Sequence, residues 1–250
     1  MMRFIYFLTL VMMPLIVYSQ NNHLDDNDLR QGYWKLYFPY NNDSILSEEG
    51  LFVNNVEDGL WIKYHDNGQV REIIHYKNGK LDGVRISISK KGKLNEQEFF
   101  LNGQYHGLQL YFHDTAKKKI EINYVHGMKE GQFIRYYKNG KKQEEAYYTN
   151  DQKHGFAEWY FDNEQLSMQY KYSYGMIIDT AYAYYKNGKL KTTYMYYNNT
   201  LNGEKKTYYP SGLMKEKGRF KEDDKHGDWC TYDSLGYQTN CVKYKNGVIE

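Results

Sequence analysis

The strongest constraint on this chain of 250 residues is a repeat of 24 residues that begins at Gly59. The sequence divides into 24-residue units without a gap, and seven of the eight units open on glycine. We number the opening residue of each unit as position 0. The residues at position 0 are Gly59, Gly83, Gly107, Gly131, Gly155, Asp179, Gly203 and Gly227. Self-similarity at this period predicts a solenoid, in which each unit packs against its neighbours.

Two columns of aromatic residues confirm the period. Position 5 holds Tyr64, Ile88, Phe112, Tyr136, Tyr160, Tyr184, Tyr208 and Tyr232, and position 17 holds Tyr76, Phe100, Tyr124, Tyr148, Tyr172, Tyr196, Phe220 and Tyr244. Aromatic residues make up 18% of the sequence, so composition alone does not explain a fully aromatic column. An earlier, irregular unit opens at Gly32 and carries three extra residues between Pro39 and Leu46. The repeat therefore has about nine units.

Each unit has the pattern of two short β segments separated by turns. Asn-Gly pairs, which favour hairpin turns because both residues tolerate positive φ, end at Gly68, Gly79, Gly103, Gly140, Gly188, Gly203 and Gly247. No segment after the first 20 residues shows a sustained helical period. The sequence predicts an all-β fold, an elongated single-sheet β-hairpin solenoid. About 18 strands at a spacing of about 4.8 Å would give a sheet on the order of 85 Å long.

Alternation along the strands predicts which side chains share a face. In the first regular unit, the odd positions 3, 5, 11, 15 and 17 hold Ile62, Tyr64, Val70, Ile74 and Tyr76, whereas positions 12, 14 and 16 are polar in most units. A three-residue loop, Asp66 to Gly68, would keep positions 5 and 11 on one face. We therefore expect both aromatic columns on the same face, where the rings pack against one another.

The four tryptophans lie at even positions, which this alternation assigns to the opposite, polar face. Trp34, Trp61 and Trp229 are at position 2, and Trp159 is at position 4. Because tryptophan dominates binding hot spots, these residues are the candidate partner-binding residues.

The sequence also resembles a known family. A unit of the form Gly-x-Trp-x-x-Tyr-x-x-Asn-Gly, followed by Tyr-x-Asn-Gly, resembles the MORN-repeat variant of the YwqK family of bacterial antitoxins. The best copies run from Gly59 to Gly83 and from Gly131 to Gly155, and the resemblance covers roughly residues 32–250. It implies stacked hairpins that bind another protein, which in the antitoxin case would be a toxin. It implies no catalytic residues.

The first 20 residues differ from the rest. A single Arg3 precedes an apolar run from Phe4 to Val17, which at 14 residues is short of the roughly 20 needed to span a bilayer. We predict a signal peptide over residues 1–19, cleaved near Ser19, a short linker over residues 20–31 and the repeat domain over residues 32–250. The mature chain is then exported, to the periplasm, the cell surface or beyond, without a stable membrane anchor.

Other features argue against several classes of function. The formal charge is +2, and its 33 basic and 31 acidic residues are interspersed, so nothing suggests a nucleic-acid partner. His106, His154 and His226 precede opening residues two or three units apart, too far to share a metal ion. No motif for catalysis, a cofactor or a metal is recognised. We therefore expect a non-enzyme without cofactors.

The only cysteines, Cys230 and Cys241, lie in the last unit at positions 3 and 14. Export and an even number of cysteines favour a disulfide. The preferred three-residue loop, however, would place the two residues on opposite faces. A bridge and two free thiols therefore both remain open.

We expect a scaffold that binds a protein partner along its length. The alternatives are neutralisation of a toxin that acts in the envelope, and glycan or cell-wall binding through exposed Trp and Tyr side chains. The end strands have free backbone groups, so edge-to-edge pairing into a homodimer is a further prediction.

Overall fold

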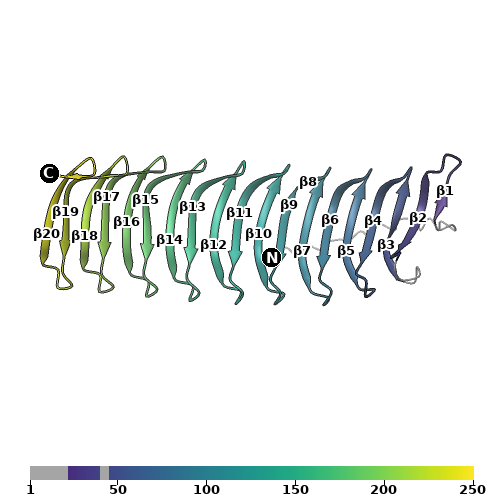
Figure 1. The fold of residues 1–250 in the computed structure, drawn as a ribbon, viewed down its shortest axis with the longest axis horizontal. Helices are drawn as coiled ribbons and strands as arrows, with labels where there is room; N and C mark the ends of the chain where they lie inside the picture. The colour runs from purple at the N-terminus through teal and green to yellow at the C-terminus, as the bar shows by residue number, and fades with distance from the viewer. Residues whose placement is uncertain (1–21, 40–44) are drawn as a thin grey trace, which may run out of the picture.

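The computed structural model describes residues 22–39 and 45–250, so the predicted signal peptide lies outside the described residues. Within these ranges the chain forms one antiparallel sheet and no helix (Figure 1). Accordingly, no helix in these ranges is suited to crossing a membrane. The all-β, single-sheet hairpin solenoid predicted from the sequence is confirmed.

The strands follow one another across the sheet in chain order. They are β1 (His23–Leu24), β2 (Arg30–Tyr37), β3 (Leu46–Val53), β4 (Val56–Tyr64), β5 (Val70–Lys77), β6 (Lys80–Ile88), β7 (Leu94–Leu101), β8 (Gln104–Tyr105), β9 (Gly107–Phe112), β10 (Lys118–Val125), β11 (Met128–Tyr136), β12 (Lys142–Thr149), β13 (Gln152–Tyr160), β14 (Leu166–Ser173), β15 (Met176–Tyr184), β16 (Leu190–Tyr197), β17 (Thr200–Tyr208), β18 (Met214–Lys221), β19 (Asp224–Tyr232), β20 (Gln238–Lys245) and β21 (Val248–Ile249).

Three of the described strands, β1, β8 and β21, have only two residues each. The other 18 described strands supply two for each of nine units. Strand β1 pairs with β2, so the segment predicted as a linker contributes a short strand to the sheet. Strands β8 and β9 both pair with β7 and are separated only by His106.

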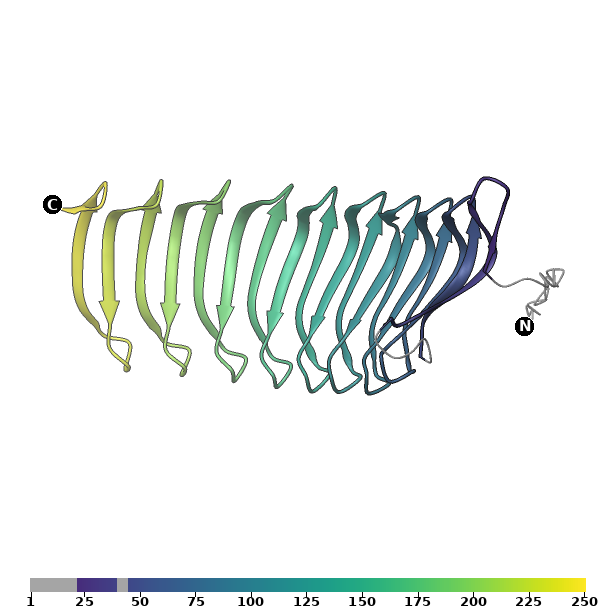
Figure 2. The same cartoon turned by 45° about the vertical axis from the view of Figure 1, so that its right-hand side comes forward.

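Two kinds of turn line the two long edges of the sheet (Figure 2). Within a unit, the loop Asp66 to Gly68 is closed by a hydrogen bond from the His65 amide to the Gln69 carbonyl, with φ of 79° at Gly68. Between units, Asn78 and Gly79 both have positive φ, of 50° and 73°, as a type I′ turn requires. The predicted loops and most of the Asn-Gly turns therefore form. Asn202-Gly203 is the exception, because this pair lies within β17 and makes no turn.

A β-bulge after the three-residue loop overturns the predicted face assignment. Tyr64 pairs with Val70, but Lys63 pairs with Glu72, so Arg71 is an extra residue on its strand. The same shift occurs in the other described hairpins. Because side chains alternate with a period of two, one extra residue moves every following side chain to the other face. The two aromatic columns therefore lie on opposite faces, and the prediction of one shared face was wrong.

A second irregularity, between units, explains the glycine at position 0. Ile74 pairs with Arg85 and Tyr76 with Leu81, so the strand of the next unit has two extra residues there. Gly83 lies in this bulge with φ of 109°, and a Cβ atom on it would lie 3.3 Å from His75 Cβ. Asp179, which replaces glycine, also has positive φ, of 68°. Aspartate tolerates this conformation better than most residues, so the backbone at position 0 is the same in the unit that lacks the glycine.

The two faces of the sheet differ in burial. We call the packed face the one formed by even positions of the first strand and positions 13, 15 and 17 of the second, as the register of the hairpins dictates. It holds most of the buried side chains, in the clusters Phe52, Trp61 and Ile74, and Ile122, Phe133, Ala146 and Ala157. We call the other face, with positions 1, 3 and 5 of the first strand and 14 and 16 of the second, the open face.

Candidate binding surfaces

The structure places two of the predicted partner-binding tryptophans in the core. Only 1% of Trp61 and 5% of Trp229 are exposed. The indole of Trp61 lies over Gly50, where an added Cβ would come within 2.3 Å of the ring, and its Nε1 donates to the Leu51 carbonyl at 3.0 Å. Trp229 repeats this arrangement over Gly218. The prediction that these side chains contact a partner was wrong, because the bulge brings positions 13, 15 and 17 onto the face of position 2 and makes it the packed face.

The other two tryptophans also lie on the packed face and are partly buried. Trp34 packs edge-on against Phe52, and its Nε1 donates to the Gln31 carbonyl at 3.0 Å. Trp159 packs edge-on against Tyr170, with the Lys153 ammonium 4.7 Å from its ring centroid. Both rings therefore pack within their own hairpins, and each also packs against a buried cluster that includes residues of the neighbouring unit.

A buried charge cluster replaces apolar packing in the third and fourth units. Glu98 is 2% exposed, and its Oε2 accepts a hydrogen bond from Arg85 Nη1 at 2.6 Å. Its Oε1 accepts from the hydroxyls of Tyr105 at 2.9 Å and Tyr111 at 3.1 Å. Burial, with the nearby Glu98 carboxylate, raises the pKa of both tyrosines. The guanidinium, the carboxylate and the two hydroxyls therefore form hydrogen bonds with one another, as a buried charge requires.

The tyrosine column at position 5 is anchored on the open face. The hydroxyl of Tyr64 donates to Glu49, and that of Tyr136 donates to Glu121 Oε1 at 2.6 Å. Burial and the Glu49 hydrogen bond raise the pKa of Tyr64 to about 12. These partly buried rings support the interpretation of this column as packing of the sheet.

An exposed set of apolar side chains crosses the open face. It occupies positions 1 and 16, which pair directly across each hairpin, as Leu60 and His75 do. We call this set the apolar row: Leu60, Phe99, Leu108, Tyr147, Phe156 and Met195, which are 36–53% exposed. The sequence analysis missed it, because the predicted register placed position 16 on the polar face and did not pair it with position 1. The sequence did contain a signal for this row: positions 1 and 16 hold large apolar residues in some units and polar residues in others.

The apolar row ends where the open face becomes charged. In the last two units, positions 1 and 16 hold Glu204, Arg219, Asp228 and Lys243. From β4 to β16 the same two columns hold no acidic residue, and their basic residues are His75 and Lys171. The open face is therefore divided into a long neutral part and a short charged end.

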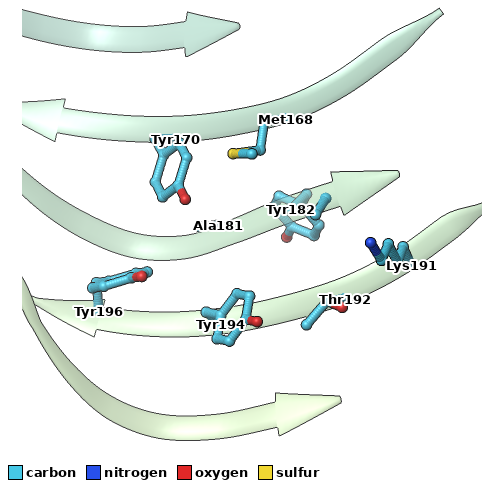
Figure 3. Close-up of a pocket in the computed structure, with 9 residues that line it drawn as sticks. Met168, Tyr170, Ala181, Tyr182, Lys191, Thr192, Tyr194 and Tyr196 are labelled. Atoms are coloured by element: carbon cyan, nitrogen blue, oxygen red, sulfur yellow. The ribbon is translucent and has the colours of Figure 1, made fainter. Parts of the chain in front are cut away.

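A cavity of about 420 Å³ opens on the packed face between the sixth and seventh units. We call it the tyrosine pocket: it is lined by Met168, Tyr170, Ala181, Tyr182, Ala183, Lys191, Thr192, Tyr194 and Tyr196. Figure 3 shows the rings of Tyr170, Tyr194 and Tyr196 around Ala181, on β14, β15 and β16. Ala181 occupies the position that holds Trp61 in the second unit, so a small residue leaves room here.

Two of the histidines lie close together. The rings of His106 and His126 meet at a centroid distance of 5.2 Å. The Nδ1 atom of His226, beside Arg219 and Lys221, is buried and has no hydrogen-bond partner among the described residues. Among the residues described, no three His, Cys, Asp or Glu side chains are grouped so that they could hold a metal ion.

The two cysteines form a disulfide between β19 and β20. The same bulge that reverses the faces also places Cys230 directly opposite Cys241. The loop length alone had left a bridge and free thiols open. The bridge joins the two strands of the last complete hairpin, which has only the short β21 beyond it.

Comparison with known proteins identifies the repeat type. Residues 57–78, 129–150 and 201–222 match the family model described as the MORN repeat variant. No curated protein matches. A chain in "Crystal Structure of TcdB2-TccC3-Cdc42" aligns over 82% of this chain at 11% identity, with a TM-score of 0.15, and this chain spans 16% of that one. A TM-score this low does not establish a shared fold. The matches to the family model show that the chain carries MORN-variant repeats.

Proposed function

We propose that the chain is an exported, non-catalytic scaffold that binds a protein partner through the apolar row. The observation that supports this most is the exposure of six large apolar side chains, 36–53% each, in two adjacent columns of one face. Exposed apolar patches in a soluble protein mark interaction sites, and Phe99 with Leu108, and Tyr147 with Phe156, lie on neighbouring strands. Tyrosine, phenylalanine and methionine are also enriched at the centres of protein interfaces.

The shape of the row favours a protein over a small molecule. From β4 to β16 it crosses twelve strands, if β8 and β9 count as one, or roughly 50 Å at about 4.8 Å per strand. A flat surface of this length does not enclose a small ligand, but it suits a partner that buries on the order of 800 Å² on each side. Neutral polar residues such as Asn123, Gln132 and Thr180 lie between the apolar ones and could form hydrogen bonds at the interface.

Two features support export. The apolar run from Phe4 to Val17 follows a basic residue, as in a signal peptide. Disulfides such as Cys230–Cys241 persist in oxidising compartments and are rare in the cytosol. Fractionation of the native host with an antibody to the chain tests this point. Recovery of the chain in the cytosol, with the first 19 residues intact, would refute it.

A toxin is a more specific proposal for the partner, and it rests on the resemblance to YwqK-type antitoxins. An exported antitoxin would act on a toxin that works in the envelope. Co-expression of the chain with candidate toxins encoded next to it tests this idea through rescue of growth. Rescue that is lost when the apolar row is altered would assign both the partner and the surface.

Photo-crosslinking tests the proposed surface directly. A photoreactive residue at Phe99 or Phe156 should give one defined crosslinked protein in the host, and the same residue at exposed Tyr237, outside the row, should not. The double variant Phe99→Ser/Phe156→Ser should weaken binding of that protein at least tenfold, whereas Tyr237→Ser should leave it unchanged. Equal crosslinking from both sites would contradict the proposal.

A further inference from the structure

The tyrosine pocket lies where the charges of the packed face disappear. Position 13 is glutamate in five of the described units, including Glu144 and Glu216, which pair with lysine at 2.9 and 2.7 Å. In the sixth and seventh units this position holds Met168 and Thr192. Both residues line the pocket, and Lys191 is the only charged side chain in the lining. The lining is therefore nearly neutral, whereas position 13 carries a charge in five other units.

The aromatic rings of the pocket also lack the cations that cover equivalent rings elsewhere. Two residues before position 0, Lys129, Lys153 and Lys225 place their ammonium groups 5.0–5.6 Å from the rings of Tyr148, Tyr172 and Tyr244. In the seventh unit the corresponding residue is Ile177. Within the described part of the chain, no cation lies over the rings of Tyr170 or Tyr196. These rings are therefore available to a ligand.

The hydroxyl groups of the pocket are available as well. Some tyrosines outside the pocket use their hydroxyls within the protein, as Tyr105 and Tyr136 do with glutamate. Across the residues that the structure describes, the hydroxyls of Tyr170, Tyr194 and Tyr196 make no hydrogen bond to protein. Burial raises the pKa of Tyr170, and burial with the neighbouring tyrosines raises that of Tyr196 to about 12, so both hydroxyls stay protonated and can donate.

We infer that the tyrosine pocket binds an uncharged saccharide. A sugar ring has apolar C–H faces that pack on aromatic rings and a rim of hydroxyls that both donate and accept hydrogen bonds. The pocket provides aromatic walls, an alanine floor and the hydroxyls of three tyrosines and Thr192, a combination that fits these two requirements. A cationic ligand would need a carboxylate, which the lining lacks, and an anionic ligand would find Lys191 alone.

The boundaries of the pocket favour a compact ligand over an extended peptide. Trp159 packs against Tyr170 on one side, at a centroid distance of 5.7 Å. On the other side Lys205, which pairs with Glu216, lies 6.0 Å from the Tyr194 ring. The open space therefore covers the width of β14 to β16. Because the pocket and the apolar row lie on opposite faces, this inference does not depend on the proposed protein partner.

Titration of the purified chain with neutral oligosaccharides tests the inference. The probes are hexasaccharides of α-linked glucose, β-linked glucose and N-acetylglucosamine, followed by calorimetry and by tryptophan fluorescence. We expect at least one of them to bind, and Tyr194→Ala or Tyr196→Ala to weaken that binding at least tenfold. Ala183→Leu, which fills the floor and keeps every tyrosine, should weaken it comparably. Tyr147→Ala, on the open face, is the matched control and should leave saccharide binding unchanged.

The outcomes separate this inference from the proposed function. No binding of any of the three probes at millimolar concentration would overturn it, as would binding that survives both Tyr194→Ala and Ala183→Leu in variants with unchanged circular dichroism. Binding of a proline-rich peptide that is lost in the same variants would assign the pocket to a peptide and overturn the saccharide. Conversely, Tyr147→Ala should weaken only the binding of the protein partner.

Discussion

The second to fourth units and the sixth and seventh units use the same backbone for different purposes. In the former, the packed face is filled by Trp61, Ile74 and the Arg85–Glu98 pair. In the latter, Ala181 and Ala183 leave a cavity between tyrosines. Both regions keep the same turns, bulges and strand register. The residues at the turns and bulges therefore maintain the hairpin stack. The side chains of the packed face can differ between units, from a filled core to an open pocket.

The largest effect is expected from removing the indole of Trp61. Trp61→Ala leaves a cavity between the first and second units and exposes the Leu51 carbonyl, so it should cost about 3–5 kcal/mol in local stability. Hydrogen exchange across β3 to β5 measures this loss. Tyr194→Ala, in the open pocket, should cost much less. Equal losses at the two sites would show that the filled and open regions do not differ in packing.

Glu98→Gln should have the next largest effect, because it leaves the Arg85 guanidinium without its most buried partner. We expect a loss of about 2–3 kcal/mol, seen as faster hydrogen exchange in β6 to β9. Glu96→Gln is the matched control, since Glu96 also contacts Arg85 but is more exposed, and its loss should stay within about 1 kcal/mol. A similar cost for both variants would mean that burial of Glu98 is not what matters.

Enlarging a side chain should lower the stability of the filled region much more than that of the open region. Gly50→Ala places a Cβ within 2.3 Å of the Trp61 ring, so it should destabilise the filled region by about 1–3 kcal/mol. Ala183→Val adds atoms to the wall of a cavity of about 420 Å³ and should change stability by less than about 1 kcal/mol. Chemical denaturation followed by tryptophan fluorescence measures both. Destabilisation by Ala183→Val as large as that by Gly50→Ala would argue against an open pocket.

The smallest effect concerns pH and the carboxylate Glu121, which lies in the fourth unit, at the end of the filled region. Burial alone would raise its pKa, but the Lys118 ammonium and the Tyr136 hydroxyl outweigh burial and lower the pKa below its ordinary value of 4.5. The ionised Glu121 carboxylate therefore stabilises the fold above about pH 4.5, and this stabilisation is lost as the pH falls through the lowered pKa.

Hydrogen exchange across β10 to β12 between pH 3 and pH 6 tests this dependence. The wild type should lose protection at the acidic end, and Glu121→Gln should be less stable at pH 6 with a weaker dependence on pH. The lining of the tyrosine pocket contains no carboxylate, so Glu121→Gln should leave β14 to β16 unaffected. An unchanged pH dependence in Glu121→Gln would show that Glu121 is not the group responsible.

The period and the local turn chemistry could be predicted from the sequence because each depends on residues close together in the chain. The 24-residue spacing of glycine and the aromatic columns, together with Asn-Gly turns such as Asn78-Gly79, determined an all-β stack of nine hairpins. The matches at residues 57–78, 129–150 and 201–222 agree with the repeat type.

Only the tertiary structure decided which side chains are buried. The extra residue at Arg71 and its equivalents reverses the alternation within each hairpin, and a bulge of this kind leaves no clear mark in the pattern of residue types. It turned Trp61 and Trp229 into core residues, brought Cys230 opposite Cys241 and exposed the apolar row. The sequence thus determined that hairpins stack, because turns are local. The faces depend on strand register, which is decided by pairing across the whole hairpin.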